Sequence, residues 1–262
     1  MGRIYLIGLG PGERALLTPA ALDAISRCDA VVGYDGYLEQ VSDLVDDKDV
    51  VSMPLGKEME RAAKAAEFAS AGVSVAVISS GDIGVYGMAG PVYEYLAANG
   101  WDGEQPRVEV VPAVSAAQAA ASVLGAPLMQ DFCAISLSDL MTPWDTIRRR
   151  LDAAAYGDFV IALYNPRSMR RRSQIVEARE IVLKHRSADT PVGIVRNARR
   201  SDEQAMLTTL GELERHFERI DMFTTLIIGN STTYIHGGRM ITPRGYMNSR
   251  DIQDGQHASP PS

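Results

Sequence analysis

The feature that most constrains this chain is a regular alternation of strand-length apolar runs with helical patterns. In the first half the apolar runs cover residues 3–8, 29–33, 49–53, 73–79 and 107–112. Helical spacing of small and apolar residues fills the gaps between them, at residues 18–27, 57–72 and 89–98. Strands that alternate with helices in this way usually form a mostly parallel sheet with helices on both faces. The first half therefore predicts an α/β domain.

The second half repeats this alternation. We expect its strands near residues 132–138, 158–164, 191–196 and 225–230, and its helices near residues 115–124, 144–155, 171–186 and 211–218. Pro112 falls where one series ends and the next begins, so we place a domain boundary there. The expected organisation is two α/β domains with mixed, mostly parallel sheets, residues 1–112 and 113–241, and a cleft between them. Residues 242–262 are polar and lack periodicity, which predicts a mobile tail.

Composition and charge exclude several classes of protein. The apolar runs are far shorter than the roughly 18 to 20 residues of a membrane span, and the start lacks the pattern of a signal region, so we expect a cytoplasmic protein. The net charge of −7 argues against nucleic acid or an anionic membrane as partner, but not against an acidic small molecule. Cys28 and Cys133 lie far apart and belong to no metal-binding motif, so we expect reduced thiols and no metal site.

The first glycine-rich loop predicts a ligand without phosphate. It lies in the stretch YLIGLGPGERALLTP, residues 5–19. A dinucleotide-binding loop has three glycines in the pattern G-x-G-x-x-G, and here Gly8 and Gly10 fit while Glu13 takes the third place. Pro11 also removes a backbone N–H of the kind that binds phosphate at a helix start.

Three further strand ends carry polar residues, as ligand-binding loops of open α/β sheets do. The stretch SSGDIGVYGMAG (79–90) has four glycines, and its Asp82 could accept a hydrogen bond from an ammonium group or could cap a helix in a tight surface loop. The stretch PAVSAAQAAASVLGAPL (112–128) begins a small-residue helix with Ser115 as its candidate cap. The stretch ISLSDLMTPW (135–144) carries Ser136, Ser138 and Asp139.

Two groups of arginines also follow expected strands. The stretch LYNPRSMRRRSQI (163–175) contains Arg167, Arg170, Arg171 and Arg172. Arginines near a helix start oppose the helix dipole, which favours a binding role, although a solvated basic face remains the alternative. The stretch VRNARR (195–200) adds Arg196, Arg199 and Arg200. Because guanidinium groups pair with carboxylates, both groups suggest a carboxylate-rich ligand.

Taken together, the stretches GLGPG, SSGDIGVYGMAG, PAVSAAQAAASVLGAP, ISLSDLMTPW and LYNPRS resemble the tetrapyrrole methylases, the class III S-adenosylmethionine-dependent methyltransferases. The resemblance covers about residues 3 to 241 and implies two α/β domains, a homodimer and S-adenosylmethionine bound in the interdomain cleft, with S-adenosylhomocysteine as product. Within the family the motifs look most like those of the precorrin-3B C17-methyltransferases. That likeness implies methylation of precorrin-3B at C17, with ring contraction to precorrin-4, in cobalamin biosynthesis.

The resemblance also implies site residues. The cofactor contacts would be Pro11, Ser80, Gly81, Asp82, Ile83, Val85, Tyr86, Gly87, Ser115, Ala116, Asn165, Ala198, Thr224 and Thr225. Asn165 stands where many relatives have methionine, and Thr224 and Thr225 stand where many have Pro-Ala. The carboxylate arms of the substrate would meet Ser138, Arg167, Arg170, Arg171 and Arg196. The candidates for catalytic proton transfer are Asp82, Ser136 and Asp139.

Three alternatives remain open. The first is the anaerobic counterpart, a cobalt-factor III C17-methyltransferase, which has very similar motifs. The second is a nicotinamide-dependent oxidoreductase, which Pro11 and Glu13 oppose although Asp29 and Asp35 lie near the ribose-binding offset. The third is a tetrapyrrole carrier without catalytic activity.

Overall fold

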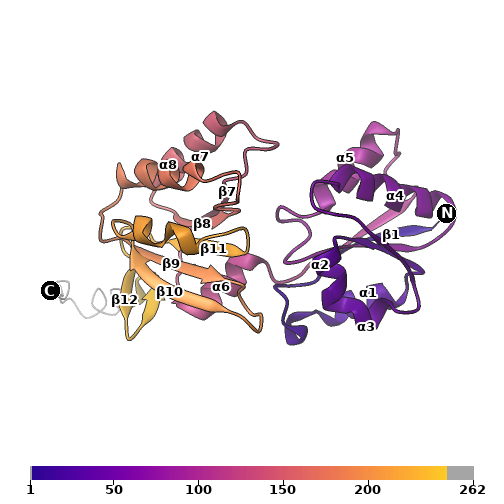
Figure 1. Cartoon of the computed structure of the whole chain (residues 1–262), viewed down its shortest axis with the longest axis horizontal. Coiled ribbons are helices and arrows are strands. Elements are labelled where there is room, and N and C mark those ends of the chain that lie inside the picture. Colours follow the sequence, from indigo (N-terminus) through magenta and orange to yellow (C-terminus); the bar gives the residue numbers. More distant parts are fainter. Residues whose placement is uncertain (1, 247–262) are drawn as a thin grey trace. The chain divides into compact units, whose positions relative to one another are not determined.

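The computed structural model describes residues 2–246 (Figure 1). By their internal contacts, the residues form two compact units. The first runs through Ala119 and takes in Ala198–Asp202, and the second comprises Ala120–Asn197 and the chain from Glu203 onward. The domain limits expected at residues 112 and 241 and the cleft between the domains stay predictions. Most of the tail expected at 242–262 lies outside the described residues.

The first unit is built on a parallel sheet of five strands in the order β3-β2-β4-β1-β5. The strands are β1 Arg3–Gly8, β2 Ala30–Gly33, β3 Asp49–Ser52, β4 Val75–Ser79 and β5 Arg107–Val111. The longer helices are α1 Pro19–Ser26, α4 Glu58–Ser70 and α5 Ala89–Ala98. These strands and helices confirm the pattern predicted for the first half. The short elements are η1 Arg14–Leu16, α2 Asp35–Leu38, η2 Glu39–Val41 and α3 Ser42–Val45, which the sequence did not predict.

The central strands β1, β2 and β4 of the first sheet are buried on both faces. Along β1, Tyr5 and Ile7 pack with α1, α2 and α3, whereas Ile4 and Leu6 pack with α4 and α5. This two-sided burial explains why the strands are nearly continuous apolar runs. At the start of α1 the Thr18 hydroxyl accepts a hydrogen bond of 3.1 Å from the backbone of the first turn.

The second unit contains a mixed sheet in the order β10-β9-β11-β8-β7. Its strands are β7 Phe132–Ser136, β8 Val160–Tyr164, β9 Pro191–Arg196, β10 Gln204–Thr209 and β11 Thr224–Ile228. Only the β7–β8 pair is parallel, and the other three pairs are antiparallel. The two-domain α/β fold with mixed sheets is confirmed, but the second sheet departs from the parallel pattern of the first. Residues 197–203 connect β9 to β10, and this connection is too short for the crossover that parallel neighbours need.

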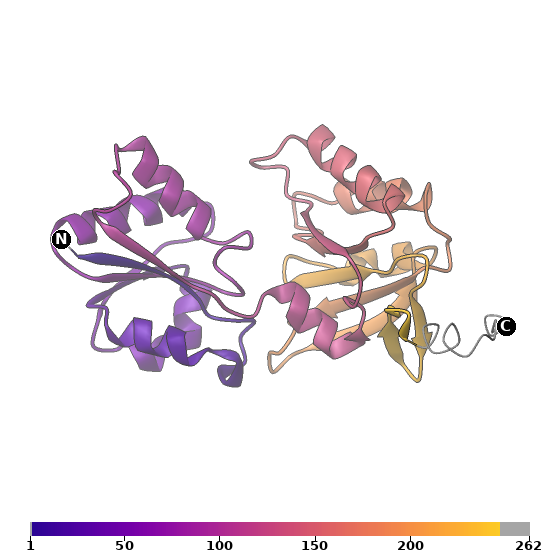
Figure 2. The ribbon, with the colours of Figure 1, turned by 180° about the vertical axis from the view of Figure 1, so that it is seen from behind.

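The helices α7 and α8 cover one face of the second sheet, and a third helix, α6, begins this half of the chain. They are α6 Ala116–Leu124, α7 Trp144–Tyr156 and α8 Ser173–Leu183. The helix expected at 211–218 is the 3-10 helix η3 Leu213–Arg219. A small sheet joins β6 Gly125–Ala126, β12 Tyr234–His236 and β13 Arg239–Ile241. Figure 2 shows α7 and α8 together on one face of the larger sheet, away from the yellow β12–β13 hairpin.

The core of the second unit lies between its sheet and the helices α7 and α8, with residues such as Leu151, Ile161 and Ile175 completely buried. On the other face, α6 approaches β9 so closely that Leu124 leaves no room for a Cβ atom at Gly193. Among the helices of residues 2–246, none combines the length and the hydrophobicity needed to cross a membrane.

Candidate functional site

Two loops of the first unit meet at the carboxyl edge of its sheet. The strands β1 and β4 are parallel neighbours that end together, with Gly8 opposite Ser79. Beyond them the backbones of Gly10 and Gly81 exchange two hydrogen bonds, of 3.1 and 2.7 Å between nitrogen and oxygen. The structure therefore brings the stretches around Pro11 and Ser80, both expected to contact the cofactor, side by side.

Glycine is required where these loops meet. A Cβ atom at Gly8 would lie 2.8 Å from the Gly81 carbonyl oxygen and 2.7 Å from the Ala113 Cβ. Gly10 and Gly81 have φ angles of +74° and +68°, in the left-handed region that other residues rarely adopt. Beside Gly81, however, a Cβ atom would meet only the Ala116 nitrogen, at 3.7 Å. The main chain thus packs tightly at Gly8, whereas the position of a Cβ atom at Gly81 is nearly open.

Arg200 holds the two loops together. Its Nε donates to the Pro11 carbonyl oxygen at 2.8 Å, and its Nη2 donates to the Ser80 hydroxyl at 3.0 Å. A Cβ atom at Gly12 would lie 2.9 Å from the arginine side chain. Burial raises the pKa of the Tyr37 hydroxyl, and the Arg200 charge partly opposes this shift. The sequence placed Arg200 in a basic cluster but gave no sign of its contacts with Pro11 and Ser80, which lie 189 and 120 residues away.

Asp82 ties the second loop to the chain after β5. One carboxylate oxygen accepts a hydrogen bond from the Gly84 N–H and the other accepts one from the Ala113 N–H, both at 2.8 Å. Each oxygen therefore accepts one hydrogen bond from the backbone. These contacts favour a structural role, the alternative that the sequence left open, and the proposed role of Asp82 as a base stays a prediction.

The other residues expected from this part of the chain differ in exposure. Ile83 and Ser115 are buried, Gly87 and Ala116 are half-buried, and Val85 and Tyr86 are exposed. Tyr86 has a φ angle of +56°. Such backbone strain in a non-glycine residue often occurs at functional sites.

In the second unit, four strands bring expected site residues to one sheet edge. Ser136 at the end of β7 lies opposite Tyr164 at the end of β8, and Arg196 at the end of β9 lies opposite Thr224 at the start of β11. Because β11 runs antiparallel to β8, its first residues lie next to Asn165, which follows β8. Residues distant in sequence are therefore neighbours here.

Side chains join the loops at this edge. The Asn165 amide donates to the Ser136 hydroxyl at 3.0 Å, and Asn165 has a φ angle of +49°. Arg171 donates from Nη2 to the Asn165 carbonyl oxygen at 2.8 Å and from Nη1 to the Ser138 hydroxyl at 3.4 Å. The Asp139 Oδ2 accepts a hydrogen bond from the amide of Gln174 in α8, at 2.8 Å.

Arg171 is a buried cation without an ion pair among residues 2–246. Its residue surface is 8% exposed, and its Nε has no hydrogen-bond partner. Burial lowers the pKa of the guanidinium, and the nearby Asp139 carboxylate partly opposes this effect. Because a buried unpaired charge is unfavourable, its presence suggests that it serves a ligand.

The remaining arginines have different environments. Arg167 is buried and donates to the Phe217 carbonyl oxygen and to Glu218, both at 2.7 Å, so it anchors η3. Arg196 pairs with Asp221 at 2.8 Å. Arg170 is exposed, and its side chain has no partner among the described residues. Of these three, only Arg170 presents a free guanidinium to a substrate.

The last expected cofactor residues lie close to the same sheet edge or to Arg200. The Thr224 hydroxyl is buried and donates to the Asp221 carboxylate at 3.0 Å, and Thr225 beside it is buried in β11. Ala198 is half-buried in the segment 198–202, which packs within the first unit. The side chains of Thr224, Thr225 and Ala198 are uncharged, and uncharged side chains suit a nucleoside better than a phosphate group.

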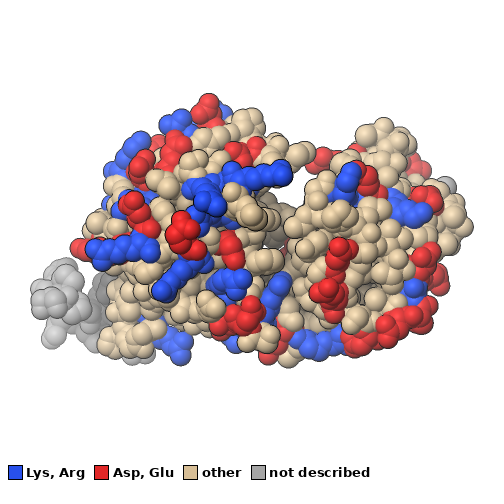
Figure 3. All heavy atoms as spheres, viewed as in Figure 1, with Lys and Arg blue, Asp and Glu red and all other residues tan. Residues whose placement is uncertain are grey.

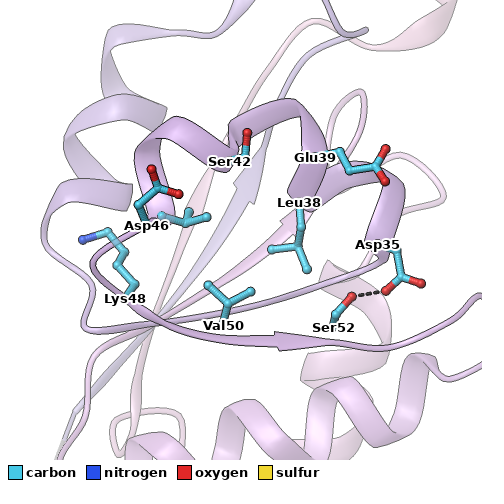
Figure 4. A pocket seen from close by; sticks show the side chains of 9 residues that line it. Asp35, Leu38, Glu39, Ser42, Asp46, Lys48, Val50 and Ser52 are labelled. Carbon is cyan, nitrogen blue, oxygen red and sulfur yellow. Dashed lines mark hydrogen bonds between the residues drawn. The ribbon is translucent and has the colours of Figure 1, made fainter.

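A separate hollow of about 530 Å3 lies beside the edge strand β3 of the first unit (Figure 4). None of the residues expected to contact cofactor or substrate lines it. The Ser52 hydroxyl donates to the Asp35 carboxylate at its rim. Its lining residues are Asp35, Leu38, Glu39, Ser42, Val45, Asp46, Lys48, Val50 and Ser52.

The groups at the first-unit edge fit S-adenosylmethionine, the cofactor implied by the resemblance. The position of a Cβ atom at Gly81 is nearly open, Pro11 has no backbone N–H to donate, and the Ser80 hydroxyl is the polar side-chain group next to Gly81. This donor set is poor for a phosphate and suitable for a nucleoside that carries a sulfonium and an amino acid group.

Comparison with known proteins agrees with this arrangement. Residues 3–214 match the family model of the tetrapyrrole (corrin/porphyrin) methylases. The cobalt-factor III methyltransferase of Priestia megaterium is 49% identical over 94% of this chain, which spans only 45% of that relative. The probable cobalt-factor III C(17)-methyltransferase of Salmonella typhimurium is 48% identical over 93% of this chain and 99% of its own length.

A solved structure extends the comparison to the fold. The crystal structure of the methyltransferase CobJ is 33% identical to this chain, with a TM-score of 0.87 over 93% of this chain and 100% of CobJ. The agreement therefore covers both units. With a family model across most of its length and a relative matched almost from end to end, this chain belongs to the tetrapyrrole (corrin/porphyrin) methylases and is a methyltransferase.

Proposed function

We propose that this chain transfers the methyl group of S-adenosylmethionine to C17 of cobalt-factor III, a cobalt-loaded tetrapyrrole, in cobalamin biosynthesis. The observation that carries this proposal is the 48% identity to a probable cobalt-factor III C(17)-methyltransferase across 99% of that relative. The sequence motifs alone favoured precorrin-3B and left cobalt-factor III as the alternative. The names of the relatives support that alternative better.

The cofactor supplies an electrophilic methyl group on its sulfonium, so the protein needs no nucleophile of its own. Its residues instead have to hold the methyl group and the accepting carbon in line, about 3 to 3.5 Å apart. We assign the cofactor to the loops that carry Pro11, Ser80 and Gly81. The short backbone pairing between these loops and the clamp by Arg200 support this assignment, because together they give a rigid support. The other cofactor contacts expected from the resemblance form part of the same proposal.

We assign the macrocycle to the second-unit edge. The exposed guanidinium of Arg170 is available to its carboxylate arms, and the charge of Arg171, which has no ion pair among residues 2–246, attracts them. Arg167 and Arg196 already have protein partners, so we give them a supporting role at this edge. Ser136 and Ser138 orient the loops through their hydroxyl groups.

We propose that Asp139, and not Asp82, moves the proton. Asp139 is half-buried, and only one of its carboxylate oxygens accepts a hydrogen bond from a described residue, Gln174. Both oxygens of Asp82 accept backbone hydrogen bonds instead. A base needs a free lone pair directed at its substrate, which favours Asp139.

A competition between two substrates tests the proposed function. The full chain is incubated with methyl-labelled S-adenosylmethionine and either cobalt-factor III or precorrin-3B, and the macrocycle is analysed by mass spectrometry. We expect one labelled methyl group on the cobalt compound, with a higher kcat/KM than for precorrin-3B. Preference for the metal-free ring would return the assignment to precorrin-3B.

Two further outcomes address the remaining alternatives. In these samples, binding of both ligands without transfer of the label would indicate a tetrapyrrole carrier. In a separate spectroscopic titration, binding of NADH but not of S-adenosylmethionine would indicate an oxidoreductase. We also propose a cytoplasmic homodimer, for which light scattering after size exclusion should give twice the chain mass of 28.4 kDa.

A further inference from the structure

Three long apolar side chains are almost fully exposed at the second-unit edge. The exposed fractions are 82% for Leu140, 91% for Met141 and 90% for Met169. Leu140 and Met141 belong to the loop that follows β7, and Met169 belongs to the loop that follows β8. Scattered exposed apolar residues are ordinary, but three at one sheet edge indicate a binding surface.

The two loops that carry them are joined by hydrogen bonds. Asp139, directly before Leu140, accepts a hydrogen bond from Gln174, and Ser138 accepts one from Arg171. The turn from Ser168 to Arg171 is closed by a backbone hydrogen bond of 3.0 Å, which leaves Met169 and Arg170 at its tip. The three apolar side chains are therefore carried by two loops that are linked to each other, and we call them together the apolar platform (Leu140, Met141 and Met169).

Positive charge borders this platform. The side chains of Arg170 and Arg172 are exposed and have no partner among the described residues. Between them in sequence is Arg171, which is nine-tenths buried and, within the described part of the chain, has no ion pair and an Nε without a hydrogen-bond partner. On the face shown in Figure 3, basic side chains gather over the part of the second unit where β7 and its following loop lie. An apolar centre with a cationic border matches a ligand with an apolar face and a rim of carboxylates.

We propose that the apolar platform packs against the flat face of the tetrapyrrole ring while Arg170 and Arg172 pair with its carboxylate arms. This inference rests on the proposed function and deepens it, because it names the side chains that hold the ring face. Methionine and leucine suit this task, since flexible thioether and branched side chains adapt to an aromatic surface. Their contact also removes water from the ring near the accepting carbon.

Binding of a tetrapyrrole probe tests the inference without any need for catalysis. The probe is uroporphyrin III, a macrocycle with eight carboxylates, titrated into the full chain and followed by its absorbance and fluorescence. The test variant carries Leu140→Ser, Met141→Ser and Met169→Ser together. We expect each lost apolar contact to raise the Kd severalfold to about tenfold, and the triple variant to raise it by about a hundredfold or more.

The matched control is Tyr156→Ser. Tyr156 is 80% exposed but ends α7 before β8 begins, at the opposite edge of the sheet. We expect its Kd for uroporphyrin III to equal that of the unchanged chain. The Kd for S-adenosylhomocysteine, measured by calorimetry, should be the same in all three proteins, which verifies that the triple variant is folded.

The salt dependence of the Kd for uroporphyrin III distinguishes the contribution of the apolar platform from that of Arg170 and Arg172. The affinity of the unchanged chain should fall as salt increases, and Arg170→Gln with Arg172→Gln should reduce that dependence, whereas the triple serine variant should keep it. An unchanged Kd in the triple variant, or an equal loss in Tyr156→Ser, would overturn the inference. If the unchanged chain does not bind uroporphyrin III at all, the tetrapyrrole assignment itself fails, and the inference fails with it.

Discussion

The carboxyl edges of the two sheets are held in different ways. In the first unit, Gly10 and Gly81 join two loops by main-chain hydrogen bonds. Because glycines stand where the loops meet, the backbone and not side chains sets the shape of this edge. In the second unit, Ser136, Asn165 and Arg171 join the loops by side-chain hydrogen bonds. A main-chain support suits a small ligand of constant shape, because it depends on backbone geometry and not on side-chain rotamers.

The charge at the two edges differs as well. At the first edge the Asp82 carboxylate and the Arg200 guanidinium both have protein partners. At the second edge, among residues 2–246, Arg170 has no partner and Arg171 has no ion pair. The two edges thus differ in whether their charged side chains already have protein partners, and this difference supports the proposal that a polyanion binds at the second edge.

The largest expected effect distinguishes the roles of the Asp139 and Asp82 carboxylates. We expect Asp139→Asn to lower kcat by about a hundredfold or more, because an amide cannot accept the proton. Asp82→Asn should mainly lower the free energy of unfolding, by about 1–3 kcal/mol, because its amide nitrogen would face a backbone N–H. Steady-state kinetics and urea unfolding measure both. A larger loss of kcat in Asp82→Asn than in Asp139→Asn would reverse the assignment.

The next effect concerns the glycine contact of the first edge. A valine at position 8 would push against the Gly81 carbonyl oxygen and Ala113, so Gly8→Val should raise the Kd for S-adenosylhomocysteine by at least about a hundredfold. Gly90→Ala is the control, because a Cβ atom there meets nothing closer than 4.0 Å and alanine favours its helix. Calorimetry should find normal affinity in the control. Normal affinity in Gly8→Val would show that the loop contact does not shape the cofactor site.

A moderate effect distinguishes two arginines of the second edge. Arg167→Met should lower the free energy of unfolding by about 1–3 kcal/mol, since it removes two hydrogen bonds to η3. Arg170→Met should leave stability unchanged and raise the Kd for uroporphyrin III about three- to tenfold. If Arg167→Met affects the probe more than Arg170→Met does, Arg167 binds substrate, as the sequence predicted.

The smallest expected effect concerns the two cysteine thiols, Cys28 in the first unit and Cys133 in the second. Burial raises the pKa of Cys28 to about 12 and that of Cys133 to about 11, from 9.0. Because the folded pKa is the higher one, the stability these thiols contribute is complete below about pH 9 and is lost as the pH rises towards 11 and 12. Urea unfolding should therefore show that the free energy of unfolding of the unchanged chain declines above pH 9. We expect a smaller decline in the variant that carries Cys28→Ala and Cys133→Ala. An equal decline in that variant would contradict this account.

Much of the fold could be predicted because the central strands β1, β2 and β4 of the first sheet are buried on both faces and almost entirely apolar. The limits of all five strands differ from the expected ones by no more than two residues. The strand β10 was missed because its residues are mostly half-buried and mix polar with apolar types. The short helices α2 and α3 were missed because four residues are too few to show a helical period.

The candidate site could be predicted only in part. The rule that ligands bind at the carboxyl edges of strands found both edges, since it depends on local strand ends. It could not find the partners of Arg167, Arg196 or Arg200, because these lie 50, 25 and 189 residues away. Which arginines are free for a ligand is a property of tertiary contacts.

We assign the cofactor to the first-unit edge and the macrocycle to the second-unit edge. This assignment is tested most directly by hydrogen–deuterium exchange on the full chain with each ligand alone. We expect S-adenosylhomocysteine to slow exchange in peptides that cover residues 8–13 and 79–88. Uroporphyrin III should slow exchange in peptides that cover residues 137–143 and 165–173. Protection of the second pair of loops only by S-adenosylhomocysteine, or of the first pair only by uroporphyrin III, would contradict the account.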